Sequence, residues 1–141
     1  MPEESTTPDL EAATRLFREA LNRRDFEAAV ALYGPEAVWN SADGLLGLVE
    51  GREAIRDALE GLVGAFEDFE TAGEEFRDFG HGVTLSVNLH RGRPRGGGGG
   101  FVELRAAAVS IWAGGLIERI TLYTDIDEAR AAAERLAEER G

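Results

Sequence analysis

Apolar side chains in the first part of the chain recur at helical spacing. Residues 10–21 place one at every third or fourth position, and Asp9 just before them is a residue type that caps helices. These features predict an amphipathic helix with one buried face. Its opposite face is expected to be solvated and carries Glu11, Arg15, Arg18 and Glu19.

Two more helices are predicted before the pattern changes. Asp25 can cap a short helix over residues 26–33, and Gly34 and Pro35 are expected to end it. Gly51 precedes a third helix with a single apolar stripe, formed by Ile55, Leu59, Leu62, Val63 and Phe66.

Beyond this helix the apolar positions follow a strand period. Residues 83–90 alternate apolar and polar side chains and form the clearest strand pattern in the chain. Similar but less regular patterns predict strands at 69–79, 101–112 and 116–124, in addition to a short first strand at 37–41. An amphipathic helix over about 127–140 closes the chain. Helices segregated to one side of an antiparallel sheet define an α+β fold.

The composition excludes several classes of function. The net charge of −12 disfavours nucleic acid and anionic membrane surfaces, because such a surface repels phosphate groups. No apolar run reaches the roughly 20 residues that span a bilayer, so we expect a cytoplasmic protein. Residues 1–8 are polar and acidic, which predicts a disordered leader and not a signal peptide. The domain is expected to cover residues 9–141.

The missing residue types narrow the chemistry further. The chain has no Cys, and all its 15 basic residues are Arg. Thiolate, zinc–sulfur and Schiff-base chemistry are therefore excluded. Only His81 and His90 supply imidazoles, and they do not form a helical metal pair, so we expect no metal and no cofactor.

Four segments resemble one known family. They are residues 17–27 (FREALNRRDFE), 35–41 (PEAVWNS), 51–55 (GREAI) and 114–129 (GGLIERITLYTDIDEA). In this order and spacing they are similar to the SnoaL-like family of the nuclear transport factor 2-like superfamily, to which ketosteroid isomerases and limonene-epoxide hydrolases are related. The resemblance covers about residues 9–137.

The resemblance implies both a shape and a range of functions. It implies a cone-shaped, curved antiparallel or mixed sheet packed on three N-terminal helices, with a C-terminal helix. It also implies an apolar pocket for a small hydrophobic molecule, and a homodimer formed through the sheet. The superfamily includes isomerases, hydrolases, cyclases and binding modules, so the fold alone does not define the reaction.

The catalytic positions of the ketosteroid isomerases do not hold the required groups here. Their base falls at Ser41, their tyrosine at Phe17 and their sheet aspartate near Ala108. An alcohol cannot replace a carboxylate as a proton shuttle near neutral pH. The resemblance therefore disfavours that isomerisation.

The epoxide-hydrolase positions are altered as well. Their Asp–Arg–Asp set reads His90, Asn88 and Leu122 in this chain, and Trp39 and Ser41 stand where the water is held. Both carboxylates that would activate water are missing, so epoxide opening by that route is also disfavoured. A polyketide-type cyclase remains open, because it needs mainly a shaped pocket and one acid/base group.

Candidate pocket residues come from several of the predicted elements. Phe17, Trp39 and Ser41 are expected to line the pocket. His90 is the best candidate for a general acid/base, provided that the polar face of strand 83–90, including Asn88, points inward. If that face points outward, these residues form a solvated or dimer-facing surface. The outward orientation is favoured, because the apolar face must be buried.

Four further candidates lie in or at the end of the last two predicted strands. Asp125 is a second candidate catalytic group, although its position also fits a helix cap. Arg105, Trp112 and Tyr123 are candidate ligand contacts, with a dimer contact as the alternative. The sequence thus predicts either a small-molecule enzyme or a non-catalytic binding module, with a dimeric scaffold domain as a third possibility.

Overall fold

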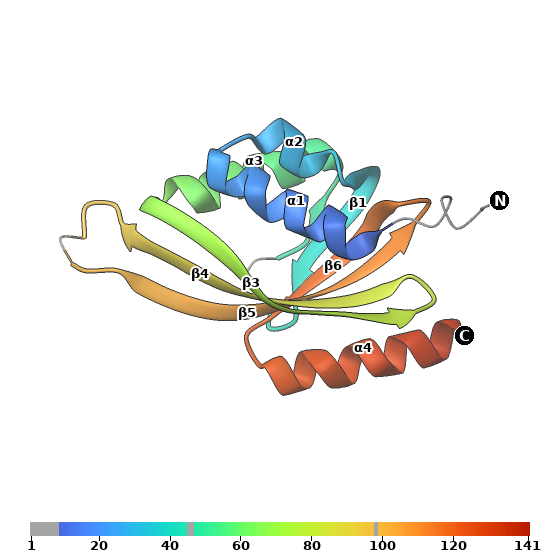
Figure 1. The fold of residues 1–141 in the computed structure, drawn as a ribbon. Helices are drawn as coiled ribbons and strands as arrows, with labels where there is room; N and C mark the ends of the chain where they lie inside the picture. The colour runs from blue at the N-terminus through green and yellow to red at the C-terminus, as the bar shows by residue number, and fades with distance from the viewer. Residues whose placement is uncertain (1–8, 45–46, 98) are drawn as a thin grey trace.

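The fold is a curved six-stranded sheet with helices on both faces (Figure 1). The computed structural model describes residues 9–44, 47–97 and 99–141, so the predicted leader 1–8 lies outside the described residues. Three helices cover one face of the sheet: α1 (Leu10–Arg23), α2 (Phe26–Val30) and α3 (Arg52–Gly64). The fourth, α4 (Ile126–Arg140), lies on the other face. The predicted α+β class is confirmed.

The sheet is mixed, and its strand order is β2-β1-β6-β5-β4-β3. The strands are β1 (Tyr33–Ser41), β2 (Val49–Glu50), β3 (Phe66–Gly80), β4 (Val83–Pro94), β5 (Val102–Ala113) and β6 (Leu116–Tyr123). β3 to β6 form the predicted antiparallel meander. β1 runs parallel to β6, and β2 adds an antiparallel edge. The two-residue β2 was not predicted, because so short a strand has no period to detect.

The caps fix where the first two helices begin. Asp9 accepts a hydrogen bond from the Ala12 backbone N–H at 3.0 Å, and Asp25 accepts one from Ala28 at 3.1 Å. Both predicted caps are thus confirmed, and each satisfies a backbone donor that the helix leaves free.

The predicted end of the second helix is wrong. α2 ends at Val30, and β1 already begins at Tyr33. Gly34 and Pro35 lie inside this strand, where its pairing with β6 shifts register between Tyr33 and Val38. A proline lacks the N–H that a regular ladder uses, so it is tolerated at such an irregularity.

Two separate apolar clusters stabilise the two faces of the sheet. The larger lies between α1–α3 and the sheet. The smaller lies beneath α4, where Val83, Leu85 and Val87 of β4 are buried against an alanine stripe, Ala129, Ala133 and Ala137. Alanines at this spacing form a smooth helix face, which lets α4 approach the sheet closely. β4 is therefore covered on both faces.

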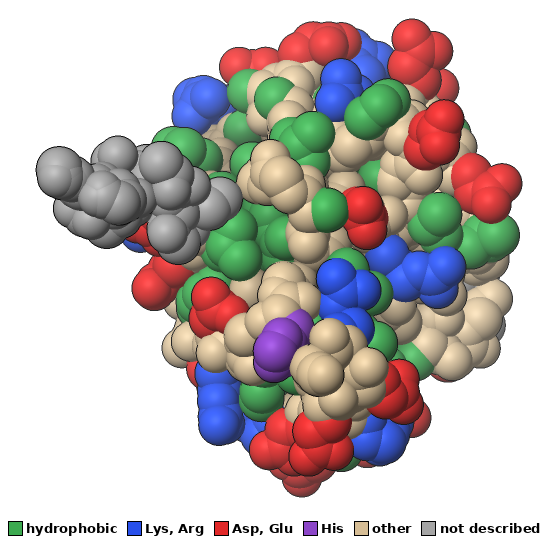
Figure 2. All heavy atoms as spheres, turned by 90° about the vertical axis from the view of Figure 1, so that its right-hand side faces the viewer, with side chains coloured by type: hydrophobic (Ala, Val, Ile, Leu, Met, Phe, Trp, Pro, Cys, Tyr) green, Lys and Arg blue, Asp and Glu red, His purple; other side chains and the backbone are tan. Residues whose placement is uncertain are grey.

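The surface reflects the acidic composition. Figure 2 shows one face of the molecule, with acidic side chains spread around its edge and basic side chains among them. Many of the ion pairs are exposed, such as Arg93 with Asp68 at 2.6 Å. Exposed pairs of this kind contribute little to stability, typically about 0–1 kcal/mol.

The cap of α4 provides a test of the role of Asp125. Its carboxylate accepts the Glu128 backbone N–H at 3.0 Å. We expect Asp125→Ala to lower the free energy of unfolding by about 1 kcal/mol, since the N–H loses its partner. Asp125→Asn keeps a capping oxygen and should retain the stability of the wild type, which urea unfolding would measure. Equal losses in the two variants would contradict the capping role.

Candidate functional site

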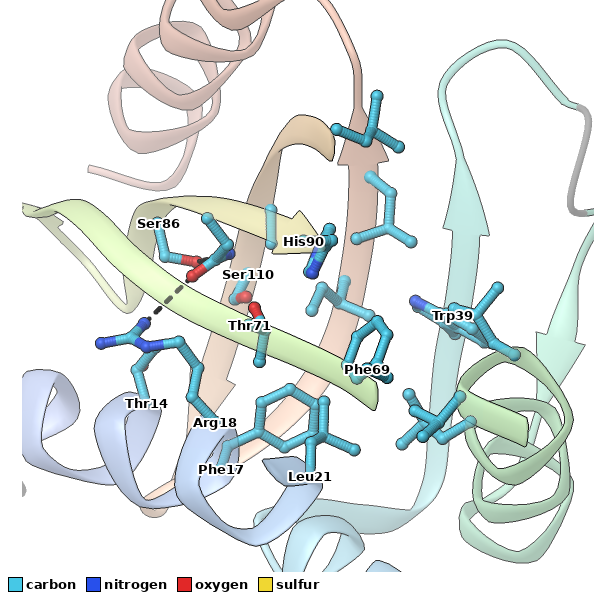
Figure 3. Close-up of a pocket in the computed structure, with 18 of the residues that line it drawn as sticks. Thr14, Phe17, Arg18, Leu21, Trp39, Phe69, Thr71, Ser86, His90 and Ser110 are labelled. Carbon is cyan, nitrogen blue, oxygen red and sulfur yellow. Dashed lines mark hydrogen bonds between the residues drawn. The ribbon is translucent and has the colours of Figure 1, made fainter. Parts of the chain in front are cut away.

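A cavity of about 220 Å³ lies between the helices α1 and α3 and the concave face of the sheet (Figure 3). Its walls are mostly apolar and aromatic. They include Phe17, Leu21, Tyr33, Trp39, Leu59, Val63, Phe66, Phe69, Ile117 and Ile120. Such a lining, interrupted by a few polar groups, is typical of small-molecule sites.

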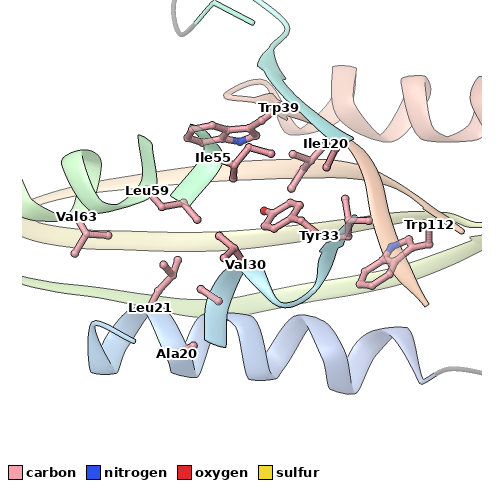
Figure 4. Packing of buried hydrophobic residues seen from close by; sticks show 14 of the residues in the cluster. Ala20, Leu21, Val30, Tyr33, Trp39, Ile55, Leu59, Val63, Trp112 and Ile120 are labelled. Carbon is pink, nitrogen blue, oxygen red and sulfur yellow. The ribbon is translucent and has the colours of Figure 1, made fainter. Parts of the chain in front are cut away.

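Tyr33 and Trp39 bring β1 into this wall. The ring of Tyr33 meets that of Phe17 edge to face, with centroids 5.9 Å apart and planes at 83°. Figure 4 shows Tyr33 and Trp39 among the buried side chains, with Leu59 of α3 and Ile120 of β6. Burial raises the pKa of the Tyr33 phenol, so it stays protonated throughout the physiological range.

A polar track crosses the apolar wall along the sheet. It consists of Thr71, Ser86, Asn88, His90 and Ser110, with Arg18 facing it from α1 (Figure 3). The favoured outward orientation of the polar face of β4 is therefore wrong. The apolar face was correctly expected to be buried, but α4 buries it, and the polar face is left to line the cavity.

Arg18 and the strand residues form a short hydrogen-bonded chain. The Arg18 Nη1–H donates to Asn88 Oδ1 at 3.1 Å, and Asn88 Nδ2 donates to Ser86 Oγ at 3.4 Å. Burial, followed by the nearby Arg15, lowers the pKa of Arg18. Because a guanidinium pKa starts above 12, the side chain still carries its charge at neutral pH. The prediction that Arg18 belongs to a solvated face is wrong.

His90 places an imidazole on the cavity wall. Its ring stacks on Phe69, with centroids 5.9 Å apart and planes at 23°. Its Nδ1 is buried and has no hydrogen-bond partner within the described part of the chain. Burial lowers the pKa of His90, so the neutral imidazole predominates near pH 7. A neutral imidazole has one nitrogen that accepts a proton and one that donates.

Phe17, Trp39, Asn88 and His90 are the sequence-predicted site residues that the structure brings together around the cavity. Two other proposed positions lie elsewhere. Ser41 is the last residue of β1, and its hydroxyl donates to Asp43 Oδ1 at 2.9 Å. Asp125 caps α4 and does not line the cavity.

The remaining three candidates also lie outside the cavity lining. Arg105 is exposed and pairs with both carboxylate oxygens of Glu74. It lies on the face of β5 opposite to that of Ala108. Tyr123 packs against the apolar cluster beneath α4. Trp112 is buried at the cavity-side cluster, but its Nε1–H is already bonded to Thr84 Oγ1 at 2.9 Å. Strand pleating separates the first two from the site.

Sequence reasoning missed several polar residues of the cavity, among them Arg18, Thr71 and Ser110. Arg18 sits at the margin of the apolar stripe of its helix, one position from Phe17. Thr71 and Ser110 are both buried, and the Thr71 hydroxyl has no partner among the described residues. Isolated hydroxyl residues give no periodic signal, so only the assembled sheet identifies them.

Most positions matched to known catalytic groups fall on the cavity wall, whereas Ser41 does not. Phe17, Asn88, His90, Ala108 and Leu122 all line it, which supports the alignment of these positions. Yet none of the described residues lining the cavity is an Asp or a Glu. Within the described ranges no three acidic or imidazole side chains gather as metal ligands, and no helix is long and apolar enough to cross a membrane.

Comparison with known proteins identifies the family. A model of the SnoaL-like domain matches residues 13–120. The chain therefore belongs to the SnoaL-like domain family, as its sequence motifs predicted. No curated protein matches the sequence.

Solved structures share the fold at low sequence identity. An NTF2-like protein of unknown function from Burkholderia pseudomallei is 19% identical, with a TM-score of 0.72 over 86% of this chain and 95% of that one. A Mycobacterium tuberculosis protein in complex with estradiol-17beta-hemisuccinate is 18% identical (TM-score 0.69; 86% and 97% covered). An epoxide hydrolase of the limonene-epoxide-hydrolase-like type from the same organism is 18% identical (TM-score 0.67; 89% and 90% covered).

The buried imidazole links stability to pH. Burial lowers the pKa of His90 in the folded protein. The contribution of the neutral imidazole to the free energy of unfolding is therefore fully present above the unfolded pKa of about 6.5. That contribution is lost as the pH falls from there towards the folded pKa. We expect the free energy of unfolding to fall more steeply below pH about 6.5 in the wild type than in His90→Gln.

Urea unfolding between about pH 5 and 7.5 measures this difference, because that range brackets the pKa of about 6.5 for a free imidazole. The control is His81→Gln, which removes an exposed imidazole from a turn and should keep the wild-type profile. Parallel profiles for the wild type and His90→Gln would contradict the burial of an uncharged imidazole.

Proposed function

We propose that the protein binds a small hydrophobic molecule in the cavity between α1, α3 and the sheet. The observation that carries this proposal is the apolar cavity itself, into which a few uncharged polar groups converge. His90 Nδ1 and the Thr71 hydroxyl are buried without partners in the described part of the chain. Because unpaired buried polar atoms are costly, a ligand that bonds to them is favoured. The complex of a structural neighbour with estradiol-17beta-hemisuccinate supports such a ligand.

Filling the cavity should abolish binding. Ala108 lies on the cavity wall and is 7% exposed, so the larger side chain of Ala108→Leu would occupy ligand space. A panel of apolar ring compounds, followed by thermal shift and calorimetry, should show saturable binding to the wild type and none to this variant. Ala113→Leu makes the same exchange at an exposed position of β5 and should bind normally. Binding unaffected by Ala108→Leu would place the ligand elsewhere.

A second candidate function is proton transfer on the bound ligand, with His90 as the base. The neutral imidazole in the cavity favours it. In this step His90 takes a proton from the carbon next to a ligand carbonyl, which leaves an enolate, and then returns a proton to that carbon. Mechanisms that need a carboxylate base are disfavoured, since the residues at the matched positions are Ser41, Ala108 and Leu122.

Hydrogen–deuterium exchange at the carbon next to a ketone carbonyl tests this step. 2-Tetralone is a small apolar ketone with acidic C–H groups, and deuterium uptake from D2O can be followed by NMR. General base catalysis predicts that the wild type accelerates the exchange by roughly 10²–10⁴-fold. His90→Gln keeps a hydrogen-bonding side chain, so it should still bind 2-tetralone but lose this acceleration, whereas His81→Gln should retain the acceleration. Equal exchange rates with the wild type and His90→Gln would leave binding as the function.

Two finer predictions remain, one from the family resemblance and one from the composition. A homodimer formed through the sheet stays a prediction, which light scattering of the purified protein measures. A cytoplasmic location likewise stays a prediction.

A further inference from the structure

Arg18 places its guanidinium at the cavity wall without an acidic side chain from the described residues in an ion pair with it. Some other arginines near the sheet have carboxylate partners, such as Arg130 with Glu75 at 2.5 Å. Among the described residues, Arg18 has no carboxylate within ion-pair distance, and its hydrogen-bond partner is the neutral amide of Asn88 at 3.1 Å. Burial lowers the pKa of Arg18 and the charges of Glu11 and Glu19 on the same helix act to raise it, but neither carboxylate forms an ion pair with the guanidinium.

The surroundings of Arg18 leave donors of the guanidinium available. An arginine has five N–H donors, and one of them is bonded to Asn88 Oδ1. On the β3 side, the absence of a side chain at Gly73 makes room for the guanidinium, since a Cβ there would overlap it. Arg18 is thus held at the cavity wall, with N–H donors of its guanidinium still available for a ligand.

The second arginine of the cavity wall is already engaged. Arg91 pairs with Glu103 at 3.3 Å and lies over the ring of Phe101 at 4.2 Å. No carboxylate of the described residues lines the cavity, so a bound anion meets no repulsion from the cavity wall itself. The site therefore offers a single unpaired positive charge beside an apolar chamber.

We propose that the ligand is an apolar molecule with one carboxylate group, and that Arg18 binds this carboxylate while the apolar part fills the cavity. This inference rests on the proposed binding function and specifies its ligand class. One guanidinium matches one carboxylate in charge and in planar geometry. Asn88 is the positioning residue, since it holds the guanidinium through its oxygen.

A matched pair of probes tests the charge preference. 2-Naphthoate carries the carboxylate, and 2-naphthamide is its neutral counterpart of nearly the same shape. In calorimetry or NMR titration, the wild type should bind naphthoate roughly tenfold more tightly than naphthamide, as expected for a charge-assisted bond. Arg18→Met should remove this preference, so that the two probes bind with similar affinity. Arg15→Met, an exposed change on the same helix, should behave as the wild type.

Two variants test the geometry without removing Arg18. Asn88→Asp places a carboxylate beside the guanidinium, so this internal anion should compete with naphthoate and make it the weaker-binding probe. Gly73→Ala introduces a methyl group into the space of the guanidinium. Since the guanidinium is the end of a flexible side chain, the fold should persist while the preference for naphthoate declines. Circular dichroism and thermal unfolding would verify that both variants fold.

The outcomes separate this inference from the function on which it rests. Equal binding of the two probes to the wild type, or a preference that survives Arg18→Met, would overturn the carboxylate assignment and leave the binding function intact. If neither probe binds the wild type and no other apolar compound does so, the binding function itself fails, and the inference fails with it.

Discussion

The structure depends on the burial of both faces of β4. Val83, Leu85 and Val87 pack beneath α4, and pleating then directs Ser86 and His90 into the space under the N-terminal helices. Burying apolar surface contributes about 25 cal/mol per Å², so the apolar face determines how the strand is oriented. Its polar face follows by geometry. A cavity with polar groups is thus a consequence of how the sheet is covered on its other side.

This orientation limits the kinds of side chain that the cavity wall can hold. Serine, asparagine and neutral histidine are tolerated at buried positions, because an uncharged group costs far less to desolvate than an ion. The lowered pKa of His90 follows from the same physics. Arg18 is charged, but it is only partly buried and approaches from α1. The absence of acidic groups from the described cavity wall therefore concerns electrostatics as well as catalysis, because it leaves the arginine unneutralised.

Much of the fold could be predicted from local signals, whereas the site could be predicted only in part. The caps Asp9 and Asp25, the meander and the family motifs all identified elements that the structure contains. The period of β4 identified its two faces, but not the side of the sheet to which each belongs. That choice depends on α4, whose alanine stripe is a weak apolar signal. Asp125 illustrates a different limit, because a cap and a catalytic carboxylate look alike in sequence.

The residues at the matched catalytic positions show how this scaffold can change its chemistry. By the family resemblance, Phe17, Ala108 and Leu122 stand where related enzymes carry polar or acidic groups, and all three line the cavity. Replacing those groups with apolar side chains removes the proton shuttles, but it also removes their desolvation cost and enlarges the apolar wall. His90 stands at one of the carboxylate positions and stays uncharged there. In the proposed function, the same curved sheet would hold a ligand mainly by shape, with one imidazole and one guanidinium to orient it.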